Sequence, residues 1–355
     1  MSANRPTPAR VGILGTGSFL PERTVGNEEM AAATGVTPEW IERKTGILER
    51  RYARGDQATS DLAAEAGRRA LENAGVHPAE LSLIIVATST PDRPQPPTAA
   101  VVQHLLGADR AAAFDVNAVC AGFVVALRAG VCMASLGDGG TGGRTLVIGG
   151  DVYSRVVDPA DRRTAPLFGD GAGAVVLGPV TGAGGFLGTR VATDSTLLDL
   201  IRVDAGGSRQ PATPGPLARG DHYFRMRGRE VRDYVTRELP RAVHGLLAEL
   251  SVPPEDIRHF VPHQANGAML KDLWTHLGLP RAHLHLPVTR HGNTGAASIP
   301  LALDHAHRSG RLAAGDLVLL AGFGGGMTMG TSLISWGGHR SAPHPAGTTT
   351  PTTKD

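Results

Sequence analysis

The chain has 355 residues, 41% of them hydrophobic, and its 35 basic and 33 acidic residues leave a net charge of only +2. This length and composition are typical of a globular protein with one large domain or two fused halves, and the balanced charge gives no reason to expect nucleic acid or an anionic membrane as a partner. The longest apolar runs, such as Leu317 to Ala321, are far shorter than the ~20 residues of a membrane-spanning helix, and the N-terminus has no charged-then-apolar signal peptide.

Short β-rich runs alternate along the chain with helical stretches rich in Ala and Leu. Strands are predicted at Val11–Gly15, Leu83–Thr88, Ala112–Val116, Leu146–Gly150, Ala174–Leu177, His259–Pro262, His283–Val288 and Leu317–Gly322. Helices are predicted at Ser60–Ala74, Ala99–Leu106, Ala121–Ser135, Gly228–Leu250, Gly267–Leu277 and Ala296–Ser309. Alternation of this kind predicts an α/β fold with layered helices and largely parallel sheets.

The segments outside this pattern are rich in Pro, Gly and polar residues. Met1 to Ala9 is predicted to be frayed, and Gly337 to Asp355 to be a disordered tail. Asp204 to Asp221 is a long Gly/Pro loop, and loops of this length are usually functional or mobile.

The chain also contains a weak internal repeat. In each half a strand leads through a helix into a second strand, which is followed by Cys120 in the first half and by Asn293 in the second. We interpret this as a duplicated βαβ-type unit with its chemistry at equivalent strand ends. The predicted division is a first half at residues 10–180, a second half at 181–336 and the tail at 337–355.

The two cysteines, Cys120 and Cys132, fall on one predicted helix, where a twelve-residue separation spans about 18 Å. A disulfide cannot bridge that distance. Two free thiols and no export signal favour a reducing, cytoplasmic location.

Cys120 lies between a predicted strand and small residues that open a helix, in the stretch AAAFDVNAVCAGFVVALRAG. The positive end of the helix dipole and nearby backbone N–H groups favour the reactive thiolate at this position. Ala121 and Gly122 leave room for a substrate. A buried, inert cysteine is the alternative interpretation of the same context.

Two further polar residues follow predicted strands in the second half. His263 ends an apolar strand in HFVPHQAN, where Asn266 or Gln264 could cap the following helix. Asn293 lies in a Gly-flanked turn, RHGNTGAASIP. Taken singly, a histidine without a role and a turn or N-cap asparagine are the better explanations of these two residues.

Glycine clusters mark two other turns. The stretch Gly322 to Gly330 (GFGGGMTMG) is either a flexible turn or a loose phosphate loop without the following Lys-Ser/Thr, and Asp170 in LFGDGAGAVVL is predicted to be structural. Two lone cysteines make no zinc pattern, and a G-x-S-x-G elbow is absent. A Cys/His/Asn set would also fit a papain-like protease, but the Cys-Gly-Ser-Cys-Trp context is missing.

Together these motifs resemble those of the β-ketoacyl-(acyl-carrier-protein) synthase III family of the thiolase superfamily. The matching stretches occur in family order between about Val11 and Trp336, namely VTPEWIERKTGILERR, FDVNAVCAGF, LFGDGAGAVVL, VPHQAN, RHGNTGAASIP and GFGGGMT. The resemblance implies a cytoplasmic homodimer with a thiolase-like fold, in which duplicated halves form a five-layered αβαβα sandwich. It also implies acyl-CoA and an acyl carrier protein as partners, and no metal or redox cofactor.

The resemblance further implies a role for each matching residue. By resemblance, Cys120 is the acylated nucleophile, and His263 and Asn293 are the pair that handles the malonyl group. Gly325 is then an oxyanion-hole glycine, and Phe323 lies beside the decarboxylation site. Trp40 and Arg162 lie on the two sides of a coenzyme A adenine, and Asn266 has a coenzyme A contact or a supporting role. The implied chemistry is acylation of the thiol, followed by loss of CO₂ from a malonyl thioester and attack of the enolate on the acyl group.

Three positions depart from the family pattern. Ala268 and Asp233 stand where a basic residue often binds phosphate or the carrier protein, although Arg225, Arg227, Arg229 and Arg232 are near Asp233 in the chain and could substitute. Gln95 stands where the partner subunit usually closes the primer pocket with Phe or Thr, and this longer polar side chain suggests a primer unlike plain acetyl.

The main expectation is a decarboxylative Claisen condensation that primes a fatty-acid or polyketide chain. One alternative is transfer of the Cys120-bound acyl group to a hydroxyl, amine or thiol acceptor without condensation. Asn293 favours condensation, because simple transfer has no enolate to stabilise. A non-catalytic homologue is expected to have lost Cys120, and a cysteine protease lacks support for the reasons above.

Overall fold

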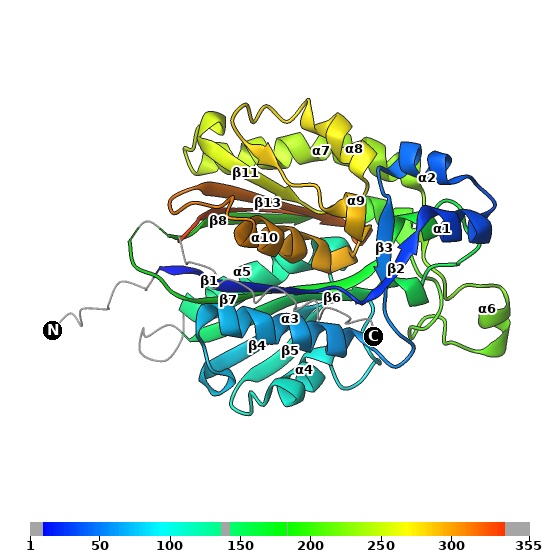
Figure 1. Ribbon diagram of the computed structural model, residues 1–355, viewed down its shortest axis with the longest axis horizontal. Coiled ribbons are helices and arrows are strands. Elements are labelled where there is room, and N and C mark those ends of the chain that lie inside the picture. The colour runs from blue at the N-terminus through cyan, green and yellow to red at the C-terminus, as the bar shows by residue number, and fades with distance from the viewer. Residues whose placement is uncertain (1–9, 136–142, 183, 338–355) are drawn as a thin grey trace, which may run out of the picture.

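The computed structural model describes residues 10–135, 143–182 and 184–337, and in these the chain forms five layers. Two five-stranded sheets lie one above the other, with a pair of helices between them and further helices on each outer face (Figure 1). The predicted αβαβα sandwich is confirmed. None of the helices within the described ranges has the length and apolar character needed to cross a membrane.

The first sheet has the strand order β1-β7-β6-β4-β5. Its strands are β1 (Val11–Phe19), β4 (Leu81–Ala87), β5 (Ala112–Val116), β6 (Arg144–Val152) and β7 (Asp170–Pro179). Strand β4 pairs in parallel with β5 and β6, whereas β7 pairs antiparallel with β6 and β1. This places β5 at an edge, directly before the turn that carries Cys120.

The second sheet repeats this arrangement as β8-β14-β13-β11-β12. Its strands are β8 (Gly185–Thr193), β11 (Ile257–Pro262), β12 (His283–Leu284), β13 (Leu317–Gly324) and β14 (Thr328–Ser335). Strand β11 is parallel to β12 and β13, and β14 is antiparallel to β13 and β8. The repeated order supports the inferred duplication, and the boundary between residues 180 and 181, which falls between β7 and β8, stays a prediction.

The prediction of largely parallel sheets is wrong, because each sheet has two parallel and two antiparallel pairings. In each half the last long strand, β7 or β14, pairs antiparallel with the strand before it and needs no crossover helix. In the second half, β13 and β14 are joined by a tight turn at Gly325–Met327, inside the glycine cluster. That hairpin excludes the phosphate-loop interpretation, which needs a helix after the glycines.

The central layer consists of α5 (Gly122–Ser135) and α10 (Ser298–Arg308). Helix α5 is apolar on nearly all sides, which is typical of a helix buried between two sheets. Phe123, Leu127, Ile299 and Leu303 are fully buried in the core that joins both sheets to these helices. Each central helix begins directly after one of the predicted site turns, so the core fixes where those turns meet.

The outer layers are formed by α3 (Thr59–Ala74) and α4 (Thr98–Leu106) on the first sheet, and by α7 (Gly228–Glu249) and α8 (Gly267–Trp274) on the second (Figure 1). These helices match their predicted positions to within a few residues. The predicted strand His283–Val288 is wrong beyond Leu284, since Pro287 ends extended pairing and Val288 starts the short helix α9 (Val288–His291).

A small lobe at one side of the sandwich was not predicted. It contains β2 (Arg23–Gly26), α1 (Asn27–Thr34), α2 (Pro38–Thr45) and β3 (Glu49–Tyr52). Arg50 is fully buried and ties the lobe to the body, because it donates to Asn27 Oδ1 at 2.9 Å and to the Pro166 carbonyl at 2.7 Å. The lobe therefore holds Trp40, on α2, in the lining of the same pocket as Arg162.

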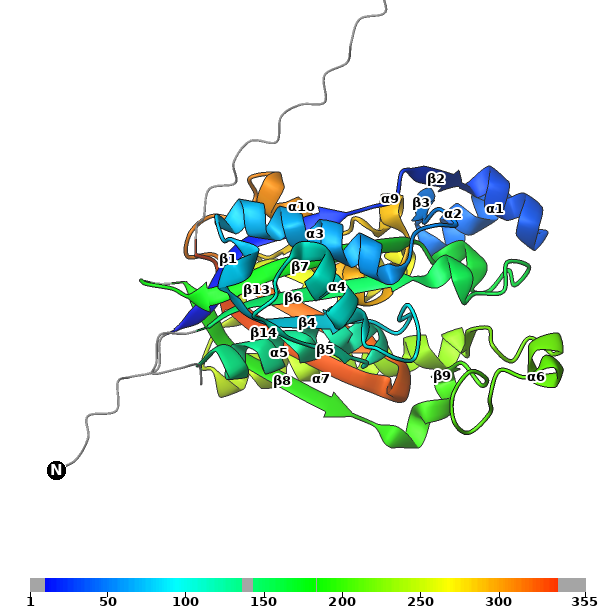
Figure 2. The same ribbon diagram turned by 90° about the horizontal axis from the view of Figure 1, so that it is seen from below.

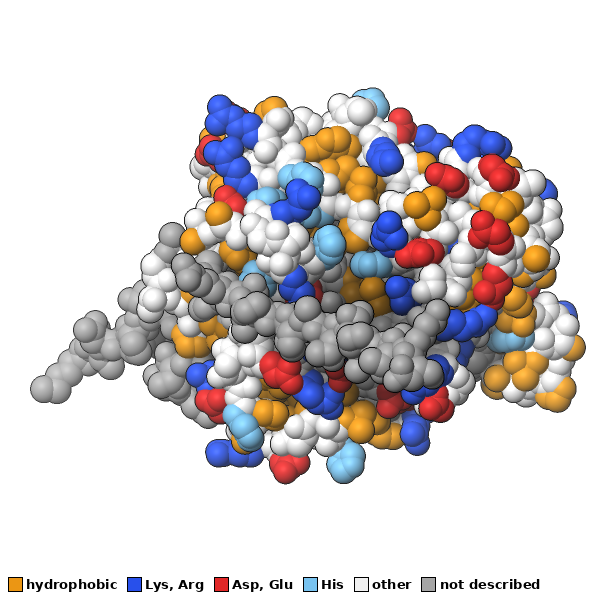
Figure 3. Space-filling model, viewed as in Figure 1, with side chains coloured by type: hydrophobic (Ala, Val, Ile, Leu, Met, Phe, Trp, Pro, Cys, Tyr) orange, Lys and Arg blue, Asp and Glu red, His pale blue; other side chains and the backbone are white. Residues whose placement is uncertain are grey.

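The predicted loop from Asp204 to Asp221 is closed at its base and contains α6 (Pro214–Ala218). The backbone N–H groups of Asp204 and Ala205 both donate to the Asp221 carbonyl, at 3.1 and 2.9 Å. The loop projects from the body in Figure 2, and Figure 3 shows hydrophobic side chains on its outer surface, where Leu217 of α6 is 41% exposed. The predicted frayed start and disordered tail lie outside the described residues, except for Gly337.

Candidate active site

Cys120 lies in a single 3₁₀ turn, Val119–Ala121, between β5 and α5. Val119 has φ = 48°, a left-handed conformation that is strained for a β-branched residue. The Asn117 side-chain oxygen supports the turn by accepting a hydrogen bond from the Val119 N–H at 3.1 Å. Cys120 itself is only 6% exposed.

The thiol is not activated in the resting protein in the way the sequence suggested. Burial, and then the charge of Asp151, raise the pKa of Cys120 to about 12, although a hydrogen bond from Tyr153 opposes the shift. The contribution of the helix N-terminus that the sequence suggested stays a prediction, and burial opposes it. Cys120 precedes α5 by a 3₁₀ turn, and the desolvation of a buried anion outweighs the dipole.

A hydrogen-bonded chain leads from the thiol into the protein. The thiol hydrogen-bonds to Tyr153, whose hydroxyl lies 2.9 Å from Ser89 Oγ, and Ser89 Oγ donates to Asp151 Oδ1 at 3.1 Å. The Tyr153 ring stacks on Phe168 with centroids 4.4 Å apart. The Tyr153 ring thus packs beside Cys120, while its hydroxyl has a hydrogen-bond partner in Ser89.

Asp151 connects three segments of the site and was missed by the sequence analysis. Its Oδ1 accepts hydrogen bonds from the 88–90 loop, including Ser89 N at 2.9 Å and Thr90 Oγ at 2.8 Å, and its Oδ2 accepts one from Ala296 N at 2.7 Å. Burial raises the pKa of Asp151, and these hydrogen bonds act against that shift. A signal was present in the sequence, because TLVIGGD places an acid directly after an apolar strand.

The glycine turn between β13 and β14 lies against the cysteine turn. A Cβ at Gly324 would lie 2.7 Å from the Cys120 backbone nitrogen, so only glycine permits this approach. A Cβ at Gly325 would lie 3.1 Å from the Val119 side chain. Phe323, the preceding residue, is 3% exposed.

His263 follows β11 and is held by Ser298, the first residue of α10. Its Nδ1 lies 2.7 Å from Ser298 Oγ, which also accepts a hydrogen bond from the Gln264 backbone N–H at 3.3 Å. The serine hydroxyl can donate to Nδ1, and on that basis we assign the ring proton of neutral His263 to Nε2. Burial lowers the pKa of His263 to about 3, so the ring is neutral at physiological pH.

The ring of His263 also meets Phe323 edge to face, with centroids 5.0 Å apart at 73°. The Gln264 side chain joins the two loops of the second half, because Nε2 donates to the His285 carbonyl at 3.0 Å and Oε1 accepts from Val288 N at 3.2 Å. Gln264 does not cap α8. Asn266 does, through a 2.9 Å hydrogen bond from Met269 N, while its Nδ2 donates to the Lys44 carbonyl.

Asn293 is fixed by its own backbone and by its side-chain oxygen. Its N–H donates to the Leu167 carbonyl at 2.7 Å, and its Oδ1 accepts from Gly295 N at 2.9 Å. The turn-forming role is therefore present, but it uses only the oxygen. The amide nitrogen has no hydrogen-bond partner in the part of the chain that the structure describes, so it remains available as a donor.

A cavity of about 440 Å³ brings five of the predicted residues together, with Asn293 and Phe323 as its buried floor. The other residues that line it come from α2, from the segments 162–167 and 226–232, and from the start of α8. They are Trp40, Arg43, Lys44, Thr45, Arg162, Arg163, Pro166, Leu167, Met226, Gly228, Val231, Arg232, Ala265, Asn266, Ala268 and Met269.

The remaining predicted residues lie outside the lining of this cavity. Cys120, His263 and Gly325 lie behind its floor, next to Phe323 and its neighbour Gly324. Gln95 is exposed on the loop before α4, and Asp233 is exposed on α7. Asp170 is buried and accepts hydrogen bonds from Ala53 N and Ser154, as a structural residue should.

A histidine cluster at the edge of the second sheet is separate from this cavity. His259 Nδ1 lies 3.1 Å from His285 Nε2, and the His283 ring meets His285 edge to face. Within residues 10–135, 143–182 and 184–337, no group of three or more His, Cys, Asp or Glu side chains could hold a metal ion.

Comparisons with known proteins agree with this geometry. Residues 114–195 match the family model of 3-oxoacyl-(acyl-carrier-protein (ACP)) synthase III, and residues 247–336 match the model of its C-terminal part. The chain is 57% identical over 334 residues to the acetoacetyl CoA synthase NphT7 of Streptomyces sp. (strain CL190), covering 93% of this chain and all of the relative.

Two further relatives extend the match. A β-ketoacyl-(acyl-carrier-protein) synthase III of Erythrobacter litoralis (strain HTCC2594) is 46% identical, over 92% of this chain and 99% of the relative. The crystal structure of the priming β-ketosynthase from the R1128 polyketide biosynthetic pathway superposes with a TM-score of 0.86 at 34% identity, covering 95% of this chain and 99% of that one.

Proposed function

The chain belongs to the 3-oxoacyl-(acyl-carrier-protein) synthase III family, and from this premise we propose that it condenses two acyl thioesters with loss of CO₂ at Cys120, His263 and Asn293. It is an acyltransferase of the ketosynthase type. One observation carries the assignment of roles. A buried thiol, a neutral imidazole and an unpaired amide N–H₂ are held by separate turns around the floor of one cavity.

Acylation of Cys120 is the first proposed step. The sulfur attacks the carbonyl of an acyl-CoA, the bond to the CoA sulfur breaks, and the thiol proton leaves with CoA. Negative charge develops on the carbonyl oxygen, where the N–H groups of Cys120 and Gly325 are the proposed donors. Burial raises the pKa of the thiol, so we propose that the sulfur loses its proton as it attacks, with the Tyr153 hydroxyl beside it.

Condensation is the second step. Loss of CO₂ from a malonyl thioester places negative charge on the thioester oxygen, and His263 Nε2–H and the Asn293 amide are the proposed donors to it. Two neutral donors stabilise an enolate without protonating its carbon. The apolar ring of Phe323 beside them favours conversion of the carboxylate to neutral CO₂. The carbanion then attacks the acyl carbon, and the Cys120 thiolate leaves.

Ser298 sets the donor tautomer of His263, so Ser298→Ala should slow decarboxylation of a malonyl thioester about tenfold or more, with Cys120 acylation unchanged. The ¹⁵N shifts of the His263 ring should move toward a mixture of tautomers. In the unaltered protein the ring stays neutral above its depressed pKa, so titration of His263 should cause no loss of rate between pH 8 and pH 5.

Two variants separate this effect from a general loss of structure. Ser298→Thr keeps the hydroxyl and should restore most of the rate. Ser309→Ala removes a hydroxyl at the other end of α10, which bonds only the Ala306 carbonyl, and should change nothing. Unchanged ¹⁵N shifts in Ser298→Ala would contradict the tautomer assignment.

The nucleotide of an acyl-CoA is proposed to lie between Trp40 and Arg162, which line the outer part of the cavity. Arg162→Ala should raise KM for an acyl-CoA about fivefold, through loss of stacking and charge. KM for a short acyl thioester without a nucleotide should not change. An unaltered KM for the acyl-CoA would argue for a starter delivered on a carrier protein.

The carrier of the malonyl group has two candidates. Malonyl on an acyl carrier protein is what the family name and the R1128 priming enzyme favour. Malonyl-CoA is favoured by the 57% identity to a protein named for making acetoacetyl-CoA, and by the uncharged Ala268 and acidic Asp233 at expected docking positions. That name also favours acetyl as the starter over the unusual primer suggested by Gln95, whose role stays a prediction.

A direct assay decides between these carriers. The protein is mixed with acetyl-CoA and either malonyl-CoA or a malonyl-carrier protein, and both CO₂ and the 3-ketoacyl thioester are quantified. Product on either carrier supports condensation and identifies the carrier. Acyl transfer without CO₂ release would revive the transferase alternative, which the comparisons do not favour.

We also propose a homodimer through the free edge of β5. This strand pairs only with β4 among the described strands, and Ala113, Phe114 and Val116 are only partly buried. A second copy of β5 would satisfy the unpaired backbone groups of that edge. The loop that carries Gln95 leads into α4 on the same half, which agrees with the expected role of that loop in the partner's site. The cytoplasmic location stays a prediction.

A further inference from the structure

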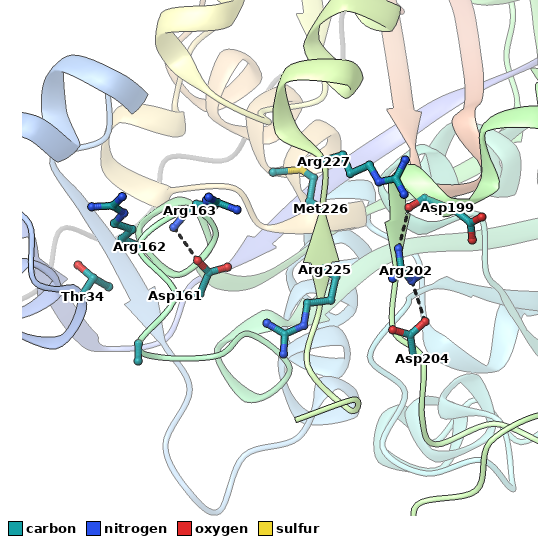
Figure 4. Close-up of a pocket in the computed structure, with 11 residues that line it drawn as sticks. Thr34, Asp161, Arg162, Arg163, Asp199, Arg202, Asp204, Arg225, Met226 and Arg227 are labelled. Atoms are coloured by element: carbon teal, nitrogen blue, oxygen red, sulfur yellow. Dashed lines mark hydrogen bonds and ion pairs between the residues drawn. The ribbon is translucent and has the colours of Figure 1, made fainter. Parts of the chain in front are cut away.

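A pocket of about 630 Å³ adjoins the substrate cavity and is lined by five arginines, Arg162, Arg163, Arg202, Arg225 and Arg227 (Figure 4). We propose that this pocket binds a phosphate-type anion between Arg202 and Arg225, and that the bound anion braces the turn that carries Gly325. Binding of the anion is independent of the proposed function, whereas its effect on Cys120 rests on that function.

The two central arginines occupy paired backbone positions on neighbouring strands. Arg202 of β9 (Ile201–Arg202) is the antiparallel partner of Arg225 of β10 (Arg225–Met226). Like charges in this position destabilise a two-stranded sheet, and these strands have only two residues each to offset the repulsion. Arg202 is partly neutralised by Asp204 at 2.7 Å and also donates to the Asp199 carbonyl at 3.1 Å. Among the described residues, Arg225 donates to the Gly220 carbonyl alone, at 3.2 Å. An anion between the two guanidinium groups would remove the repulsion.

The residues that line the pocket carry more positive than negative charge. Five arginines and three aspartates line this pocket, and Arg227 is also paired with Glu230 at 3.7 Å, which leaves one arginine in excess. The carboxylate of Asp161 is occupied by local hydrogen bonds from Arg163 N at 3.0 Å and Thr164 Oγ at 2.8 Å. The guanidinium groups of Arg162 and Arg163 have no hydrogen bond or ion pair among the residues described. Planar guanidinium groups in this number suit the oxygens of phosphate, and the volume is in the range of ligand sites.

The arginine pair is joined to the active site through one residue on each strand. Ile201 precedes Arg202, and a Cβ at Gly325 would lie only 3.2 Å from the Ile201 side chain. Met226 follows Arg225, pairs with Ile201, and lines both the arginine pocket and the substrate cavity. An anion that holds β9 and β10 together therefore holds Ile201 against the Gly325 turn. A fixed turn is what an oxyanion donor requires, since preorganisation is the source of its effect.

The test uses inorganic phosphate and adenosine 3′,5′-bisphosphate as probes, with KCl at matched ionic strength. The unfolding midpoint of the full chain should rise with probe concentration. Acylation of Cys120 from acetyl-N-acetylcysteamine, a donor without phosphate, should become about threefold faster or more in the presence of the probe. An effect of phosphate alone indicates free phosphate as the source, and an effect only of the bisphosphate indicates the nucleotide end of a carrier.

Arg225→Gln and Arg202→Gln should each weaken probe binding about tenfold and abolish the acceleration. Without probe, Arg225→Gln should be at least as stable as the unaltered protein, because the repulsion is gone. Arg209→Gln, exposed on the same loop and outside the pocket lining, is the matched control and should behave like the unaltered protein.

Two results would overturn the proposal. In the first, neither probe shifts the unfolding midpoint beyond the KCl control. In the second, the shift persists undiminished in both arginine variants. If acetyl-CoA still acylates Cys120 in that case, the proposed function stands and only the anion site is wrong. If the probe binds as expected but no thioester acylates Cys120, the anion site stands and the proposed function fails.

Discussion

Replacing Cys120 with alanine should abolish the covalent acyl-enzyme and lower the rate of condensation by about 10⁴-fold or more, because no other nucleophile replaces the thiol. The loss is measured as absence of the acyl mass increment on the intact protein and as absence of 3-ketoacyl product. Cys120 is buried, but its side chain is small, so the variant should keep the fold.

The second cysteine provides the control. Cys132 is exposed on α5 and free, so Cys132→Ala should retain both acylation and condensation. Cys120→Ala should still release CO₂ from a malonyl thioester, because His263 and Asn293 are unchanged. An acyl adduct on Cys120→Ala, or loss of activity in Cys132→Ala, would show that the nucleophile is assigned wrongly.

Replacing Asn293 with alanine should leave acylation of Cys120 intact and slow decarboxylation by about 10²- to 10³-fold, which is the usual loss when one donor to a developing oxyanion is removed. The amide nitrogen is the free donor at the floor of the cavity. Single-turnover acylation and release of CO₂ from a malonyl thioester measure the two steps separately.

The Asn293→Asp variant distinguishes loss of the hydrogen-bond donor from loss of the folded structure. The side-chain oxygen of Asn293 accepts from Gly295 N, and aspartate can keep that hydrogen bond while it loses the donor. The aspartate variant should therefore fold normally and decarboxylate no faster than Asn293→Ala, since its charge also opposes the enolate. Full decarboxylation by Asn293→Asp would assign Asn293 a purely structural role.

Much of the scaffold follows from strong local patterns. The predicted helices agree with the structure because their apolar residues recur at helical spacing, as in α3 and α10. Strand β14 was missed because Thr328 to Ser335 is rich in small polar residues. Packing requires the glycine in this strand, since a Cβ at Gly330 would lie 2.9 Å from Val124 of α5. Such a constraint is visible only once the layers are assembled.

In the site, too, some residues can be identified from local sequence motifs, and others only from tertiary contacts. The family resemblance named Trp40, Arg162, Asn266, Asn293 and Phe323 as site residues, and the structure places all five in the lining of one cavity. The supporting residues could not be named in this way, because their roles arise from contacts across the fold. Asp151 meets Ala296 across 145 positions of the chain, and Ser298 meets His263 across 35. The raised pKa of Cys120 was likewise hidden, since burial depends on the finished core.

The most direct test of the central claim is the intact mass of the protein after incubation with acetyl-CoA, followed by a chase with a malonyl thioester. We expect an acetyl adduct on Cys120 that disappears during the chase, as CO₂ and an equal amount of 3-ketoacyl thioester appear. An adduct that forms but persists through chases with both malonyl-CoA and malonyl-carrier protein would contradict condensation as the function of this site.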